Sequence, residues 1–104
     1  MKVAIIGFGF VGKSLFNGLK DTVEVKKIDP KLGTNIGELG DFAPEILFIC
    51  VPTPMNGDKT QDISIVKSVI DKIKKLQITP LVVLKSTLLP DHVKELENNL
   101  PRFI

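Results

Sequence analysis

Four short apolar runs alternate with segments of helical or irregular character, and this alternation constrains the fold of the 104-residue chain more than any other feature. Each run is bounded by charged or polar residues, glycine or proline, as is common for strands buried in a parallel sheet. The runs are residues 3–6, 23–28, 46–51 and 81–84. The pattern predicts an α/β fold, with right-handed crossovers and helices on both faces of a doubly wound parallel sheet.

Helical spacing of apolar residues supports two of the connections. A helix is expected to begin near Phe10 and to carry a stripe of Val11, Leu15, Phe16 and Leu19. A second helix is expected after Asp62, its predicted N-cap, with the stripe Ile63, Val66, Val69, Ile70, Ile73 and Leu76. Residues 31–44 are rich in glycine, which predicts an irregular crossover with about one helical turn.

The last part of the chain predicts a helix over 90–100 and the start of a fifth strand at 103–104. The sheet is therefore expected to be incomplete, with about four strands and the start of a fifth. A sheet that stops there leaves an edge of unpaired N–H and C=O groups. The helix faces that would meet the rest of the domain also stay apolar. We therefore expect the chain to associate with itself through the sheet edge or these helix faces, or to be only marginally stable.

Composition excludes several classes of function. Hydrophobic residues make up 43% of the chain and charged residues 25%, and the net charge is +2, without a basic stripe for nucleic acid. The single cysteine, Cys50, excludes an internal disulfide, and with the single histidine, His92, it gives no metal-ligand cluster. No apolar run resembles a signal peptide or a membrane span, so a cytoplasmic protein is expected.

The first apolar run leads into a glycine loop. Gly7, Gly9 and Gly12 match the pattern in which one glycine permits a tight turn, one lets a pyrophosphate approach and one permits helix packing. Asp29 follows the second run, where an acid accepts hydrogen bonds from an adenosine ribose and repels a 2′-phosphate. The loop predicts a site for NAD rather than NADP. The alternative is a glycine-rich turn that binds nothing.

The two later runs also end in distinctive segments. Val51-Pro52-Thr53-Pro54 follows the third run and Lys85-Ser86-Thr87 follows the fourth. Ligands of open α/β sheets bind beyond the carboxyl ends of the strands. Four strand ends are therefore expected to face one crevice.

These four segments, with a proline at Pro90, resemble the N-terminal NAD-binding domain of the UDP-glucose/GDP-mannose dehydrogenase family, in order and spacing along the whole chain. The resemblance implies that a nucleotide sugar lies between this domain and later ones. It also implies that the sugar's C6 alcohol is oxidised to a carboxylate through a cysteine-bound thiohemiacetal, with two NAD reduced.

The resemblance implies a role for each matching residue. Gly7, Gly9 and Gly12 form the pyrophosphate turn, and Asp29 binds the adenosine ribose. Phe10 and Val11 offer backbone N–H groups, and Thr53 and Thr87 line the nicotinamide side of the cofactor site. The other cofactor-binding positions are Val51, Pro52 and Ser86. Thr87 is also expected to position a catalytic water. Alternatively, the hydroxyls of Thr53 and Thr87 cap turns between strand and helix.

The family's nucleophilic cysteine, catalytic lysine and aspartate and most sugar-binding residues correspond to positions beyond residue 104. Residues 1–104 are therefore expected to be a truncated NAD-binding domain that binds NAD weakly and catalyses nothing alone. Cys50 is expected to be an inert core residue, Lys85 to contact backbone or solvent, and His92 to lie on the surface. Two alternatives stay open: a stand-alone NAD-sensing or nucleotide-sensing module, and a fragment of another β-hydroxyacid-type dehydrogenase.

Overall fold

The computed structural model describes residues 1–58, 61–85 and 94. Four strands alternate with helices in the predicted order. The elements are β1 (Lys2–Ile6), α1 (Phe10–Leu19), β2 (Glu24–Ile28), the 3₁₀ helices η1 (Pro30–Leu32) and η2 (Ile36–Glu38), α2 (Leu39–Phe42), β3 (Ile46–Ile49), α3 (Ser64–Lys75) and β4 (Leu81–Leu84). The helix predicted over 90–100, apart from Lys94, and the strand predicted at 103–104 lie outside the described residues.

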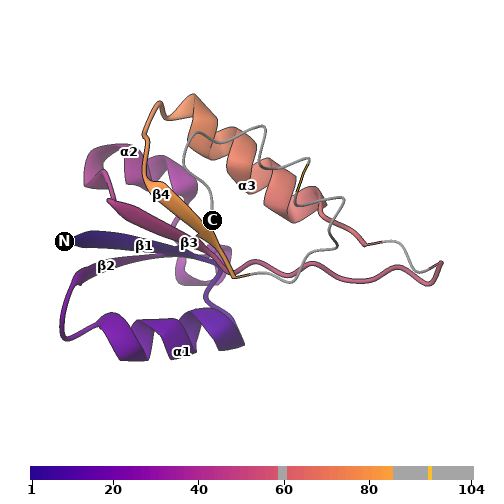
Figure 1. The fold of residues 1–104 in the computed structure, drawn as a ribbon, viewed down its shortest axis with the longest axis horizontal. Helices are drawn as coiled ribbons and strands as arrows, with labels where there is room; N and C mark the ends of the chain where they lie inside the picture. Colours follow the sequence, from indigo (N-terminus) through magenta and orange to yellow (C-terminus); the bar gives the residue numbers. More distant parts are fainter. Residues whose placement is uncertain (59–60, 86–93, 95–104) are drawn as a thin grey trace.

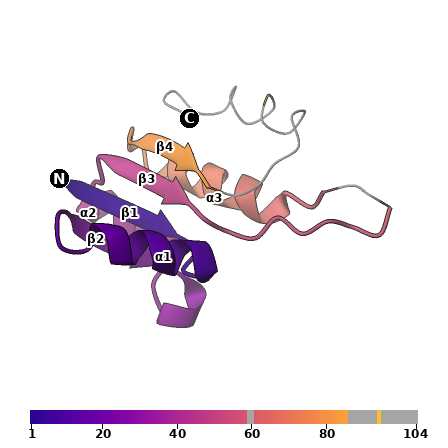
Figure 2. The same ribbon diagram turned by 60° about the horizontal axis from the view of Figure 1, so that its bottom comes forward.

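The four strands form one parallel sheet in the order β2-β1-β3-β4. Helix α1 lies on one side of the sheet, and α2 and α3 lie on the other (Figure 1). In the turned view the arrows of β1, β3 and β4 point the same way (Figure 2). The predicted α/β class and parallel doubly wound sheet are confirmed, and the carboxyl ends of the strands meet at one edge.

The main core lies between the sheet and α3. Alternate strand residues point to the same face, which buries Ala4, Ile6, Leu47, Ile49 and Val82 against Val66, Val69, Ile70 and Ile73. Leu76 packs against this core, and Ile63 is also buried. All six predicted positions of this stripe therefore face the interior.

Helix α1 packs less deeply than its predicted stripe suggests. Val11 is 46% exposed and Leu15 is only half-buried, whereas the buried residue of the helix is Gly12. Phe16 contacts the ring of Phe8 edge-on, with 5.6 Å between ring centroids. The absence of a side chain at Gly12 brings this helix close to β1, so its long apolar residues lie at the margin of the contact rather than inside it.

Two local predictions need correction. The crossover between β2 and β3 contains three short helical segments, η1, η2 and α2, rather than one turn. The N-cap position of α3 is Ile63, one residue later than predicted. Asp62 nevertheless serves the same end of the helix, because its carboxylate accepts a hydrogen bond of 2.9 Å from the Ser64 N–H.

Candidate functional site

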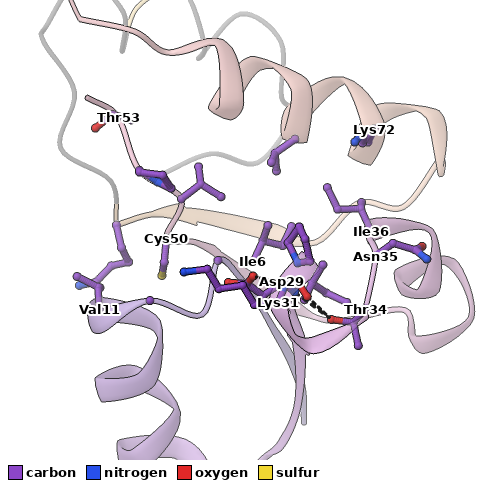
Figure 3. A pocket seen from close by; sticks show the side chains of 18 of the residues that line it. Ile6, Val11, Asp29, Lys31, Thr34, Asn35, Ile36, Cys50, Thr53 and Lys72 are labelled. Carbon is purple, nitrogen blue, oxygen red and sulfur yellow. Dashed lines mark hydrogen bonds between the residues drawn. The ribbon is translucent and has the colours of Figure 1, made fainter. Parts of the chain in front are cut away.

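A cavity of about 820 Å³ opens at the carboxyl ends of the strands. All four strand ends contribute to it, as do η2 and α3 (Figure 3). Predicted residues that line it are Gly7, Gly9, Phe10, Val11, Asp29, Val51, Pro52 and Thr53. Segments far apart in the sequence therefore meet in one hollow, because parallel strands all end at the same edge.

Each glycine of the loop has a different environment. Gly7 has a φ of +91°, and a β-carbon there would lie 2.8 Å from the backbone carbonyl of Cys50. A β-carbon at Gly12 would overlap the carbonyl oxygen of Gly7. At Gly9, which lines the cavity, a β-carbon would meet no atom within 4 Å. The fold thus explains Gly7 and Gly12, but the open space at Gly9 is available to a ligand.

The amino end of α1 faces the cavity without a side-chain cap. Gly9 is the N-cap residue, no side chain accepts a hydrogen bond there, and the first turn contains no acid. Phe10 and Val11 both line the cavity. The uncapped N–H groups and the positive end of the helix dipole attract anionic oxygens.

Asp29 ties the glycine loop to the end of β2. Its carboxylate accepts hydrogen bonds from the backbone N–H of Lys31 at 2.9 Å and of Phe8 at 2.6 Å. These two bonds, the Lys31 one first, hold the pKa of Asp29 below its ordinary value. The side chain is therefore ionised at neutral pH, and each oxygen keeps a lone pair for a further donor.

The crossover after Asp29 supplies residues that sequence analysis missed. Thr34, Asn35 and Ile36 line the cavity beside Asp29 (Figure 3), and Lys72 of α3 lines it too. The Thr34 hydroxyl accepts a hydrogen bond of 2.9 Å from the Asp29 N–H. Glycine-rich composition concealed this segment, although its position directly after a strand end was a usable signal.

Cys50 differs from its prediction. It follows β3 rather than lying inside it, and its half-buried side chain lines the cavity instead of the core. Burial raises the pKa of its thiol to about 11, an effect opposed by the charge of Lys85. The thiol is therefore protonated at neutral pH and a poor nucleophile, as expected.

The other strand-end predictions are placed only in part. Lys85, at the end of β4, lines the cavity. Ser86, Thr87 and His92 lie outside the described residues. Within the described ranges, no three histidine, cysteine, aspartate or glutamate residues are grouped to hold a metal ion. In the same ranges, no helix has the length and apolar character needed to cross a membrane.

Known structures share this fold. The chain matches a GDP-mannose dehydrogenase from Pseudomonas aeruginosa with 21% identity and a TM-score of 0.72, covering 90% of this chain and 30% of that one. It matches a UDP-D-ManNAc dehydrogenase from Pyrococcus horikoshii with 22% identity and a TM-score of 0.74, covering 95% of this chain and 32% of that one. It also matches a UDP-glucose dehydrogenase from Pyrobaculum islandicum with 19% identity and a TM-score of 0.62, covering 98% of this chain and 34% of that one.

The chain thus spans about a third of the length of these enzymes. No curated protein matches it by sequence. The model of the NAD-binding domain of one family, however, matches residues 17–102, most of the chain. That match begins after the glycine loop, so the loop is independent support for it. By this match, the chain belongs to the UDP-glucose/GDP-mannose dehydrogenase family and corresponds to its NAD-binding domain.

Proposed function

We propose that the cavity at the strand ends binds NAD(H), with the cofactor's pyrophosphate against the glycine loop. The observation that carries the proposal is the uncapped end of α1 beside Gly9, where the chain leaves both hydrogen-bond donors and open space. Backbone N–H groups of Phe10 and Val11 are the proposed donors to the pyrophosphate. Gly7 and Gly12 shape the turn that presents them.

The residues that follow β2, β3 and β4 are proposed to contact the rest of the cofactor. Asp29 is proposed to accept hydrogen bonds from the adenosine ribose, and Val51, Pro52 and Thr53 to border the nicotinamide. Ser86 and Thr87 are proposed for the same end on the family resemblance alone, Thr87 also as a positioner of catalytic water. NAD, when bound, accepts a hydride from an alcohol. Because Asp29 is ionised, it repels a 2′-phosphate, which favours NAD over NADP.

For an enzyme that contains this domain together with the later domains of the family, we propose oxidation of the C6 alcohol of a nucleotide sugar to a carboxylate. The related enzymes named above act in this substrate class, since their names specify GDP-mannose, UDP-D-ManNAc and UDP-glucose. The catalytic cysteine that the resemblance implies has no equivalent in Cys50, whose thiol is protonated at neutral pH. We therefore propose that residues 1–104 alone bind cofactor without turning over a sugar.

Titration calorimetry of the purified chain tests cofactor binding. We expect saturable binding of NAD at millimolar concentration and weaker binding of NADP under the same conditions. No saturable signal with NAD contradicts the proposal, and a preference for NADP contradicts the role given to Asp29. Reduction of NAD by this chain with UDP-glucose or GDP-mannose, followed by NADH absorbance, contradicts the proposed lack of activity.

We also propose that the chain associates with itself and that it is cytoplasmic. Phe10 is 92% exposed and Met55 is 56% exposed, which provides apolar surface for contact between chains. Light scattering over a range of protein concentrations measures this directly. A monomer at every concentration contradicts self-association without affecting the cofactor site.

A further inference from the structure

At the carboxyl end of β2, one side chain pairs two backbone groups of the outer edge. In a complete doubly wound domain a further strand lies outside the second one, but none of the described residues forms a strand there. The Thr34 hydroxyl instead donates to the carbonyl of Lys27 at 2.9 Å and accepts from the N–H of Asp29 at 2.9 Å. One hydroxyl thus makes the two hydrogen bonds, to the Lys27 carbonyl and from the Asp29 N–H, that a neighbouring parallel strand would otherwise make.

The same residues connect this edge to the glycine loop. Asp29, held by Thr34 through its backbone, accepts a 2.6 Å hydrogen bond from the Phe8 N–H through its carboxylate. The N–H of Gly7 donates to the carbonyl of Ile28 at 2.8 Å. Two consecutive residues of the loop are therefore fixed to two consecutive residues at the end of β2.

We propose that Thr34 and Asp29 form a positioning pair that fixes the glycine loop in its binding conformation before the cofactor arrives. The proposal rests on the proposed cofactor site and adds to it. Asp29 then has two roles, because its carboxylate holds the loop and keeps lone pairs for the ribose. Thr34 acts only through Asp29 and is not a ligand.

The physical benefit is a smaller entropic cost of binding. A glycine-rich loop has more conformational freedom than other segments. If the loop becomes ordered only when a ligand binds, the entropy that the loop loses reduces the affinity for that ligand. A charge-assisted hydrogen bond to Phe8 restricts that freedom in the free protein. Removing the Thr34 hydroxyl should therefore lower the affinity for every ligand that contacts the loop, including a ligand without a ribose.

The first experiment needs no ligand. Amide hydrogen exchange of Phe8 is measured by NMR in the wild-type chain, Thr34→Val, Thr34→Ser and Asp29→Asn. We expect Phe8 exchange to be about 3- to 10-fold faster in Thr34→Val, the usual effect of one hydrogen bond, and faster still in Asp29→Asn. Thr34→Ser should restore protection. Unchanged Phe8 exchange in Thr34→Val overturns the proposal, whatever the result for Asp29→Asn.

Thr22→Val is the matched control. The Thr22 hydroxyl also donates to a backbone carbonyl, that of Leu19 at 3.1 Å, but in an exposed turn at the other end of α1. Its loss should leave Phe8 exchange unchanged. A change of equal size in this variant would show a general loosening of the fold, and that too overturns the proposal.

The second experiment measures binding of NAD and of inorganic pyrophosphate. We expect Thr34→Val to weaken both by a similar factor, about 3- to 10-fold, with recovery in Thr34→Ser. Weaker NAD binding with unchanged pyrophosphate binding assigns Thr34 to the ribose and overturns the positioning role. If the wild type binds neither probe, the proposed function fails, while Phe8 exchange still decides whether the pair fixes the loop.

Discussion

Helices α1 and α3 each connect two parallel strands, but their amino ends are built for different purposes. Asp62 accepts a hydrogen bond from an N–H in the first turn of α3, whereas no side chain caps α1. Helix α3 buries Val66, Val69 and Ile70 among its core positions, while α1 buries only a glycine. A side chain thus accepts from the amino end of α3, whereas the amino end of α1 has no such side chain.

This difference separates stability from binding within one small domain. An N–H group at the start of a helix that already donates to a side chain is not free to bind a ligand. An uncapped helix that opens on a cavity gives up some stability in exchange for an anion site. We therefore expect substitutions in α3 to affect unfolding, and substitutions at the start of α1 to affect cofactor affinity.

The largest expected effect is on the core face of α3. Ile70 is 2% exposed, so Ile70→Ala should lower the free energy of unfolding by about 2–5 kcal/mol. Ile65→Ala is the matched control, since Ile65 lies on the same helix but is 42% exposed, and it should cost less than about 1 kcal/mol. Urea denaturation measures both. If Leu15→Ala in α1 lowered the free energy of unfolding as much as Ile70→Ala, α1 would contribute to stability as α3 does, which contradicts the proposed difference between the two helices.

The second effect concerns the amino end of α1. Gly9→Ala should reduce NAD affinity at least about tenfold, because its methyl group takes space where the pyrophosphate is proposed to lie. The free energy of unfolding should change by less than about 1 kcal/mol, since a β-carbon at Gly9 meets no protein atom within 4 Å. Titration calorimetry and urea denaturation separate the two quantities.

Gly18→Ala is the control for that substitution. A β-carbon at Gly18 also meets nothing within 4 Å, but the residue lies near the carboxyl end of α1. It should gain about 0.5–1 kcal/mol of stability through helix propensity and leave NAD affinity unchanged. Equal losses of affinity in Gly9→Ala and Gly18→Ala would contradict a pyrophosphate site at the start of the helix.

The smallest effect is expected at the cap of α3. Hydrogen bonds from the Ser64 hydroxyl and N–H hold the pKa of Asp62 below its ordinary value of 3.8. A lowered pKa in the folded state stabilises the fold above pH 3.8, and this contribution is lost as pH falls through the folded pKa. Asp62→Ala should therefore lower the thermal unfolding midpoint at neutral pH, with a smaller difference in acid.

Asp62→Asn distinguishes the hydrogen bond from the charge. Asparagine is also a good cap, so this variant should keep most of the wild-type midpoint at neutral pH. It should lack the component of the pH dependence that Asp62 contributes. An Asp62→Ala midpoint that equals the wild type at every pH would show that the cap adds nothing measurable to α3.

The regular elements could be predicted from sequence because each has a local cause. The four apolar runs became strands with ends shifted by no more than two residues, and the stripe of α3 faces the core because helical periodicity sets one face. The crossover after Asp29 could not be predicted in the same way. Its short helices depend on hydrogen bonds such as that from the Asn35 N–H to Glu38, which glycine-rich composition does not reveal.

By itself, the sequence determined the parallel α/β fold, the family resemblance and the glycine loop, since these depend on periodicity and on residues close along the chain. Only the tertiary structure decided that Thr34 supports Asp29, that Cys50 faces the cavity and that, of the three glycines in the loop, Gly9 is the one with free space for a β-carbon. Those relations join residues separated along the chain, and their geometry depends on how β2, the crossover and β3 pack together. Periodicity sets which face of an element is buried, but packing sets what each buried or exposed atom meets.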